Sequence, residues 1–332
     1  MTSSWEIGMD LRFFDSKTKL DIAYYSTRVD DQIVNVRVSP ASGYILQTRN
    51  EGSVKNHGVE ISLEQQIMKT KDIEWTAAAN FGLNRGTVLS LPEQITELQG
   101  TQYTDMFPTA YLHGSTTAIS GKDYLRTEDG KIICTPEGTP KIDPQKQKLI
   151  GNREPDFLLG VSTNFRWKDL SVGLLVDGRC GGDVANVTAR GLYSNGQHRD
   201  LEFYRNRQII FDGVVEQADG TYVPNTTPVI FDEKFMNDYF VAVSSNFIED
   251  GSYIRLSYVT LAYDFGSLLK KTPITGLKLS VTGRNLFLLT HYSGNDPQIN
   301  INTSSGGTGG MGIDNYNVPT TRSFNFNLNI SF

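Results

Sequence analysis

The chain has 332 residues, of which 38% are apolar, 20% charged and 11% aromatic, and its formal net charge is −6. This acidic balance, without any basic cluster, argues against nucleic-acid binding. No run approaches the roughly 18 consecutive apolar residues of a membrane-spanning helix, yet a mean hydropathy of −0.32 is also what the alternating strands of a membrane β-barrel produce.

Alternation of apolar and polar residues runs through the chain, while amphipathic helical patterns are nearly absent. In the segment WEIGMDLRF the apolar residues take every second position, so their side chains lie on one face of a strand. The chain closes on the same pattern, RSFNFNLNISF, apolar on one face and rich in amides on the other. In chain order the pattern predicts nine strands, at residues 5–13, 19–29, 56–67, 72–84, 155–167, 170–180, 252–265, 276–287 and 322–332.

The connections between these strands alternate between short and long. The short ones have about 2–10 residues, and the long ones have roughly 26, 70, 71 and 34 residues by these boundaries. Loops beyond ~15 residues are uncommon in compact domains. Tight turns that alternate with long loops are typical of outer-membrane barrels. The sequence therefore predicts an all-β chain, a segment of an antiparallel transmembrane β-barrel with long extracellular loops.

Aromatic residues stand near both ends of several predicted strands, at positions of the same parity. Trp5 and Phe13 do so on the first strand, and Tyr253 and Tyr263 on the seventh. Separations of about 8 to 12 residues, on strands tilted near 45°, give roughly 19–28 Å of height, close to the ~25 Å apolar band of a membrane barrel. We predict a membrane-facing girdle of Trp5, Phe13, Trp75, Phe165, Trp167, Tyr263 and Phe265.

The same parity predicts which side chains point inward. Aromatic residues near the short turns, with Phe332 among them, are expected to point outward at one height, and Arg12, Asn164, Arg166 and Asn329 to point into a lumen. Alternation alone leaves a second interpretation open. A soluble β-sandwich that binds carbohydrate would bury the apolar faces of its strands between two stacked sheets.

The number of predicted strands is odd, whereas bacterial single-chain barrels have even numbers. The opening MTSSWEIGMD also lacks the basic start and apolar run of a signal peptide. We therefore expect a fragment of a larger barrel, whose first strand runs inward from the outside, and the odd count disfavours a self-sufficient small porin.

Several motifs together resemble the SusC/RagA-like TonB-linked outer-membrane transporters. They include EIGMDLRFF near the start, NEGSVKNHGVEISL, SYIRLSYVTLAYDF, GRNLF followed by YSGNDP, and the terminal strand with its final aromatic residue. The resemblance runs along nearly the whole chain. It implies that residues 1–332 are the C-terminal third of such a barrel, which has about 22 strands, and that the plug domain, TonB box and signal peptide are absent.

The resemblance also implies a function and partners. Members import oligosaccharides or peptides across the bacterial outer membrane, with a SusD-like lipoprotein as lid and energy from the TonB complex, which would act through the missing N-terminal part. Outer-membrane lipid surrounds the barrel, and the barrel-assembly machinery reads the last strand. The expected assembly signal is Phe324, Phe326, Leu328, Ile330 and Phe332. We expect no enzyme activity, no cofactor and no nucleic-acid partner.

Other patterns are less specific. Gly307, Gly309 and Gly312 match GxGxxG, but no strand precedes them and no helix follows, so a loop is the better interpretation. Cys134 and Cys180 have no metal-binding spacing; two free thiols are expected, with a disulfide as the alternative.

Acidic and aromatic residues in the long loops allow two readings each. The acids are interpreted as solvated loop residues, with calcium ligation as the alternative; they are Asp232, Glu233, Asp238, Glu249 and Asp250. The tyrosines are suited to stacking on sugars, but loop packing or contact with the lid explains them equally well; they are Tyr103, Tyr193, Tyr204, Tyr222, Tyr292 and Tyr316.

Overall fold

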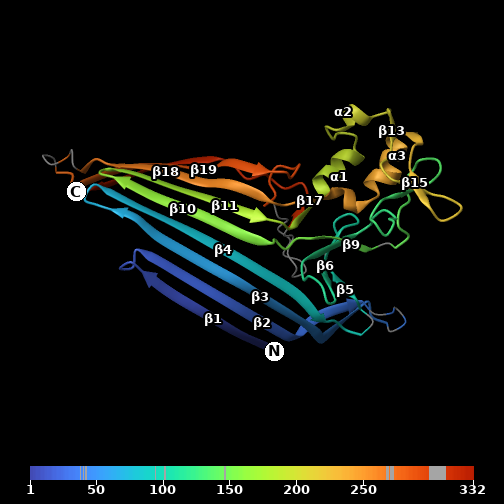
Figure 1. Ribbon diagram of the computed structural model, residues 1–332, viewed down its shortest axis with the longest axis horizontal. Helices are drawn as coiled ribbons and strands as arrows, with labels where there is room; N and C mark the ends of the chain where they lie inside the picture. Colours follow the sequence, from blue (N-terminus) through green and yellow to red (C-terminus); the bar gives the residue numbers. More distant parts are fainter. Residues whose placement is uncertain are drawn as a thin grey trace.

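The nine predicted strands form one continuous antiparallel sheet in sequence order (Figure 1). The computed structural model describes residues 1–37, 39, 41, 43–93, 95–100, 102–145, 147–266, 269, 273–298 and 312–332. Gly307 and Gly309 therefore lie outside the described residues. The strands are β1 (Thr2–Phe13), β2 (Thr18–Arg37), β3 (Leu46–Lys69), β4 (Ile73–Ser90), β10 (Phe157–Trp167), β11 (Leu170–Cys180), β18 (Tyr253–Asp264), β19 (Gly276–Thr290) and β21 (Ser323–Ser331).

The sheet is open, because β1 and β21 are its two edges. Short turns join the strands at one end, and the long connections leave from the other end, where β1 begins (Figure 1). The four-residue turn between β1 and β2 reverses the chain tightly because Phe14, Asp15 and Ser16 have positive φ angles of 54°, 55° and 64°. The nine long strands do not form two stacked sheets, so the sandwich interpretation is wrong.

The first long connection is much shorter than the sequence pattern predicted. β2 continues to Arg37 and β3 begins at Leu46, where a loop of roughly 26 residues was expected. Bulges interrupt the pairing between Val29 and Gln32 and again after Gln32. A bulge adds an unpaired residue and reverses which parity faces which side. The alternation is therefore broken at this point, although the hairpin itself continues.

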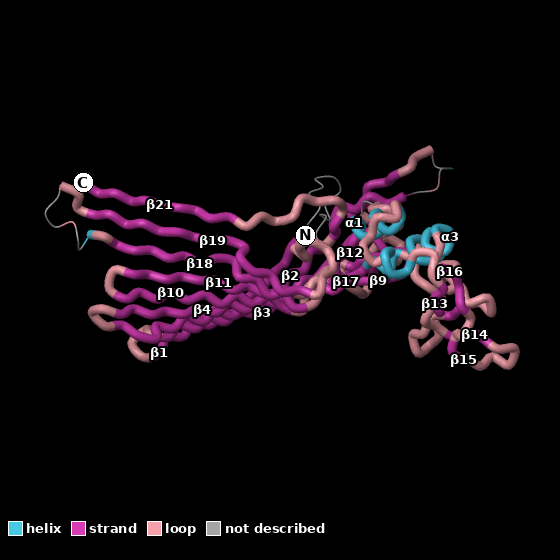
Figure 2. The backbone as a smooth tube through the Cα atoms, turned by 90° about the horizontal axis from the view of Figure 1, so that it is seen from above, coloured by secondary structure: helices cyan, strands magenta, loops and turns pink. Residues whose placement is uncertain are grey.

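The other long connections fold together into a loop head beyond one end of the sheet (Figures 1 and 2). One small sheet has the order β5-β6-β7-β9, another β17-β12-β20, a third β15-β14-β8, and a pair β13-β16. Their bounds are β5 (Glu97–Gln99), β6 (Phe107–Tyr111), β7 (Ala118–Gly121), β8 (Ile133–Cys134), β9 (Lys148–Asn152), β12 (Asp183–Asn186), β13 (Gln208–Ile210), β14 (Val214–Glu216), β15 (Tyr222–Pro224), β16 (Pro228–Ile230), β17 (Ile248–Asp250) and β20 (Ile313–Asp314).

Short helices complete the head: α1 (Val187–Ser194), α2 (Leu201–Tyr204), α3 (Glu233–Phe235), a π-helical turn (Met236–Val241) and a 3-10 turn (Ser244–Phe247). Among the described residues, no helix has the length and apolar character needed to cross a membrane. The Asn186 side chain caps α1 by accepting a hydrogen bond from the Ala189 amide, and Asp232 caps α3 in the same way.

A hydrophobic core holds the head together. It joins residues of all three long connections, which lie far apart in sequence: Tyr103, Met106, Ile119, Ala185, Val187, Ala189, Leu201, Phe231, Phe235, Met236, Val241, Phe247 and Ile313. The ring centroids of Phe231 and Phe235 are 5.5 Å apart, and those of Phe240 and Phe247 are 5.6 Å apart. The head is thus a packed unit, because these rings leave water only when the connections meet.

Candidate functional site

One face of the large sheet is apolar and its aromatic residues pair across strands. Trp75 lies opposite Phe165, with ring centroids 6.3 Å apart in an edge-to-face arrangement. The Tyr263 and Phe265 rings are 4.7 Å apart, and Trp5 packs on Tyr24 at 5.3 Å. These aromatic residues do not form a buried core, because Trp5 and Trp167 keep about half of their surface exposed, at 53% and 51%.

Four of the predicted girdle residues near the short turns occupy two adjacent rows of the sheet. Trp75 and Phe165 share one row. Trp167 and Tyr263 both lie opposite Leu170 and so share the next row toward the turns. Phe13 is the last residue of β1 and lies opposite Thr18, beside the turn that joins β1 to β2. Their role as a girdle in contact with lipid stays a prediction.

The sequence prediction placed Tyr253 on the apolar face with Tyr263, and this is wrong. The pairing of β18 shifts between Leu256 and Tyr258, so Ser257 is an extra residue that reverses the parity. Tyr253 therefore lies on the polar face, opposite Arg179, and is 6% exposed.

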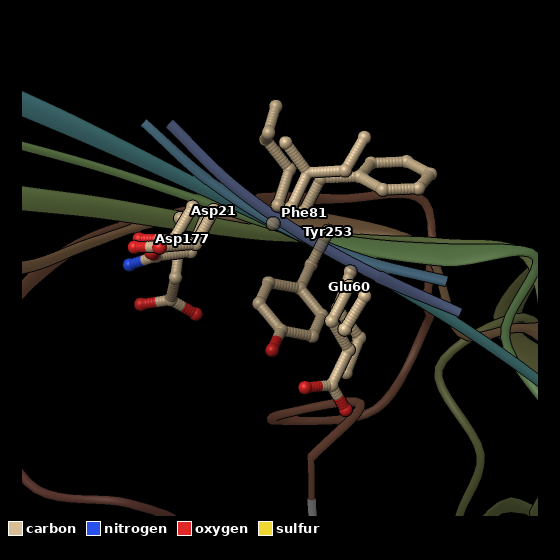
Figure 3. A pocket seen from close by; sticks show the side chains of 14 residues that line it. Asp21, Glu60, Phe81, Asp177 and Tyr253 are labelled. Carbon is tan, nitrogen blue, oxygen red and sulfur yellow. The ribbon is translucent and has the colours of Figure 1, made fainter. Parts of the chain in front are cut away.

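The opposite face of the sheet is polar. A groove of about 510 Å³ is lined by residues of both faces (Figure 3). On the polar side of the sheet lie Asp21, Glu60, Asp177 and Tyr253, and on the other side lies Phe81. Further toward the short turns, Arg166 pairs with Glu74 at 3.1 Å and Lys19 with Glu64 at 3.1 Å. These pairs are partly exposed, and such pairs contribute little stability.

The inward-facing residues that were predicted lie in part along a second groove of about 570 Å³ on this face. Asn164 and Arg166 line it together with Thr260 and Arg284. Asn329 lies opposite Lys278, which lines the same groove. Arg12 forms an exposed ion pair with Asp10 at 3.1 Å. The assignment of this face to a lumen stays a prediction for the individual residues.

A buried ion pair ties the last long connection to the polar face. Arg255 on β18 and Asp296 are 5% and 1% exposed, and the Arg255 Nη2 donates to the Asp296 Oδ1 at 2.6 Å. The Gln298 amide donates to the same oxygen at 2.9 Å, and Thr320 donates to the other. These contacts hold both ends of the connection against the sheet.

Two further residues fix this connection within the loop head, one by a contact to its own strand β20 and one by a contact to β17. The Tyr292 hydroxyl donates to the Asp314 carboxylate at 2.7 Å, and burial together with that carboxylate raises the pKa of Tyr292 far above its ordinary value. Ser293 donates through its amide and its hydroxyl to Glu249, at 2.7 and 2.8 Å. The connection, which contains β20, is thus bound both to the sheet and to β17.

Four of the five loop acids form hydrogen bonds or ion pairs within the loops. Asp232 caps α3, Asp238 pairs with Lys234, and Glu249 binds Asn186 and Ser293. Asp250 accepts hydrogen bonds from Ser252. Glu233 is exposed in the first turn of α3. Among the described residues, no group of three or more His, Cys, Asp or Glu side chains is arranged to hold a metal ion.

The loop tyrosines divide into two sets. Tyr103 and Tyr292 are buried, and Tyr193 stacks on His198 with centroids 3.9 Å apart, so these three belong to loop packing. Tyr204, Tyr222 and Tyr316 are exposed. Both cysteines are free, with Cys134 buried and Cys180 partly exposed.

A larger groove lies where the extended β2–β3 hairpin meets the β5–β6 part of the head. We call it the junction groove; its polar lining residues include Gln32, Asn35, Asn56, Ser90, Gln99 and Thr116, and its volume is about 740 Å³. That volume lies within the range of ligand sites. Asn56 has the parity of Glu60 on β3, so the groove continues the polar face of the sheet.

Comparison with known proteins assigns the fold. The model of the family described as "TonB dependent receptor-like, beta-barrel" matches residues 1–286. The chain belongs to this family. It is 24% identical to the TonB-dependent receptor P3 of Formosa agariphila, over 98% of this chain and 34% of that protein. It is 23% identical to the TonB-dependent receptor SusC of Bacteroides thetaiotaomicron, over 100% of this chain and 32% of SusC.

Solved structures agree with this TonB-dependent receptor fold. The structure of the RagAB peptide transporter matches with a TM-score of 0.71 and 21% identity, over 100% of this chain and 35% of that chain. The chain therefore spans about a third of the length of its curated relatives. Receptors of this family are outer-membrane β-barrels, and the nine-stranded sheet is a segment of such a barrel.

The receptor residues that sequence reasoning missed lie in contacts between distant segments. Arg255 belongs to SYIRL and Asp296 to YSGNDP, two motifs that carried the family resemblance, yet nothing in either motif indicates that they pair. The junction groove was missed because the hairpin that forms one wall was taken for a loop.

Proposed function

We propose that residues 1–332 form the C-terminal portion of the barrel of a TonB-dependent importer, and that the plug domain and TonB box belong to a part of the protein outside this sequence. The observation that carries this proposal is the single open sheet with one apolar and one polar face. In a membrane barrel the apolar face meets lipid and the polar face lines the lumen. The loop head then stands at the extracellular mouth.

The proposed cargo is an oligosaccharide or a peptide, imported together with a SusD-like lipoprotein that covers the mouth. The likeness to the RagAB peptide transporter supports a peptide cargo. The oligosaccharide class and the lipoprotein partner follow from the resemblance of the sequence motifs to SusC/RagA-like transporters. Energy would come from the TonB complex through the upstream part. The barrel-assembly machinery would insert the protein by recognising the strand from Phe324 to Phe332. No catalytic role is proposed.

The test is an uptake assay with the full-length protein in cells that contain or lack TonB. Cells with both the protein and TonB are expected to accumulate labelled oligosaccharide or peptide, and cells that lack either one are not. Accumulation that is unchanged without TonB, at the same amount of protein in the outer membrane, would contradict active import. Deletion of the lipoprotein partner is expected to lower uptake at limiting substrate concentration.

A further inference from the structure

The junction groove differs in chemistry from the rest of the polar face. None of the described residues that line it is charged or aromatic, although 20% of the whole chain is charged and 11% is aromatic. By contrast, the groove of Figure 3 is lined by Asp21, Glu60 and Asp177. The junction groove combines amides and hydroxyls with aliphatic side chains such as Val34, Val88 and Leu98.

Several polar groups in this groove have no partner within the protein. Among the described residues, the side chains of Gln32, Asn56, Ser90 and Thr116 form no intramolecular hydrogen bond. The Asn35 Oδ1 accepts from the Thr48 hydroxyl at 2.8 Å, which leaves its amide nitrogen free. Amides and hydroxyls both donate and accept, so these groups can bind a neutral ligand that does the same.

Two of the free groups converge on one point of β4. A methyl group added to Gly86 would overlap the Thr116 Oγ1 and would lie 2.9 Å from the Asn56 Oδ1. Both atoms are therefore held over the Gly86 backbone, from the neighbouring strand β3 and from the head. Because Gly86 has no side chain, both oxygens can pack against its backbone, and Gly86 itself is buried beneath them.

We propose that the junction groove binds an uncharged stretch of a peptide cargo, with the amides and hydroxyls on the peptide backbone and the aliphatic side chains around apolar residues. This rests on the proposed import function and narrows its cargo class. A charged residue in the groove would lose hydration without gaining a counter-ion. Sugar rings stack on aromatic faces, and the described lining contains none.

The test compares two glycines of the same strand in the full-length protein. The methyl group of Gly86→Ala would displace the Asn56 and Thr116 side chains from the groove wall, whereas Gly82→Ala is a matched control, because nothing lies within 4 Å of its added methyl group. The probe is a heptapeptide of Gly, Ser, Val and Gln with blocked ends, titrated by calorimetry. Gly86→Ala is expected to weaken its binding about tenfold, as two hydrogen bonds are lost, and Gly82→Ala to leave it unchanged.

Two further variants keep the test decisive if Gly86→Ala perturbs folding. Thr116→Val preserves shape and removes one hydroxyl, so binding of the neutral peptide should weaken about threefold to tenfold. Asn56→Asp adds a negative charge without changing shape. This variant should bind the neutral peptide more weakly, and it should bind more tightly a peptide in which one Gln is replaced by Lys.

Three results would overturn the proposal. The first is equal affinity of the Gly86→Ala and Gly82→Ala proteins for the peptide. The second is no binding of the neutral peptide by a protein that is active in import. The third is that Gly86→Ala weakens the binding of maltoheptaose but leaves the binding of the peptide unchanged. The uptake assay separates these from failure of the proposed function. If the unmodified protein imports neither peptide nor glycan, the import function itself is wrong; if it imports peptide and the two glycine variants behave alike, only the groove assignment is wrong.

Discussion

At the scale of single residues, Arg255 and Asp296 show how much depends on a contact between distant parts of the chain. The sheet is thin and most of its side chains are at least partly exposed, but these two are almost fully buried. A buried charge is tolerated only when it is paired and hydrogen-bonded. The carboxylate has partners on both oxygens, so the pair fixes where the connection crosses the polar face.

Replacement of one partner should therefore be costly. Asp296→Ala in the full-length protein is expected to lower the free energy of unfolding by about 3–5 kcal/mol, because the Arg255 charge would remain buried without a counter-ion. Urea unfolding in detergent measures this. The matched control is Asp238→Ala, which breaks the exposed pair with Lys234 and should change the free energy of unfolding very little, because water screens that pair. Equal effects of the two variants would contradict the role given to the buried pair.

Asp123 should make the loop head sensitive to acid. Burial alone would raise the pKa of this carboxyl, but hydrogen bonds from Arg126, Ser245 and the Tyr124 amide together hold it below its ordinary value. A depressed pKa stabilises the folded state above the unfolded pKa of about 3.9, and this stabilisation is lost as the pH falls through the lower folded value.

The measurement is hydrogen exchange of residues 118–145 between pH 6 and pH 3. Exchange corrected for intrinsic rates should rise as the pH falls below about 4, and Asp123→Asn should be less protected at pH 6 and lose this pH dependence. Asp238→Asn, at an exposed site of the head, serves as the control. Protection in the unmodified protein that stays constant to pH 3 would show that Asp123 does not stabilise the head in this way.

At the scale of elements, the side chains of β10 alternate between the apolar and the polar face of the sheet. Val161 and Ser162 are neighbours that lie on opposite faces, because successive side chains of a strand alternate. Val161 lies opposite Ala79 and Val176 on the apolar face, and Ser162 lies opposite Ala78 and Leu175. The strand therefore offers a direct test of which face meets lipid.

Val161→Arg should destabilise the full-length protein by about 2–4 kcal/mol, since it places a charge near the middle of the apolar band. Ser162→Arg, one residue along the same strand, should cost little, because its side chain reaches a wet lumen. Unfolding in detergent or lipid bicelles compares the two. The reverse order of costs would mean that the faces are assigned the wrong way round.

The terminal strand β21 should matter for assembly rather than for transport. Phe332 is 85% exposed, so its replacement costs little packing in the folded sheet. Phe332→Ser in the full-length protein is expected to lower the amount that reaches the outer membrane, without changing uptake per inserted molecule. Quantitative blotting of membrane fractions checks this, with Asn327→Ser on the polar face of the same strand as the control. Normal insertion of Phe332→Ser would remove Phe332 from the assembly signal.

At the scale of the whole molecule, the sheet ends in two strands that pair on one side only. β1 and β21 are its edges, and each presents backbone groups without a ladder partner. Each unsatisfied backbone group in lipid costs several kcal/mol, and an open edge in water invites aggregation. A closed barrel removes both problems, which is why further strands are expected between β21 and β1.

Residues 1–332 expressed alone should therefore aggregate or require detergent, and should not transport. Addition of the upstream strands and plug should restore both membrane insertion and uptake. Size-exclusion chromatography in plain buffer is the decisive measurement. A monodisperse monomer with cooperative unfolding would show that the edges are covered without a closed barrel, and the membrane interpretation would lose its main physical support.

The sequence by itself determined the long strands, their order and most of their faces. Period-two alternation is a local property, so it survives in any context that keeps one side of a strand apolar. Hairpin topology then follows from short turns between neighbouring strands. The prediction was wrong where a bulge adds one residue, as at Ser257 and beyond Val29, because the parity of everything past that point is reversed.

Only the tertiary structure decided how the long connections fold and what they leave open between them. The head core brings Met106, Val187 and Ile313 together across more than half of the chain, and no periodicity marks such residues in advance. No sequence pattern marks in advance the Arg255–Asp296 pair or the junction groove, where Asn56 and Thr116 come together. These features depend on contacts between residues that are far apart in sequence, and such contacts stabilise the fold only once the connections have come together. A local pattern in the sequence therefore cannot predict them.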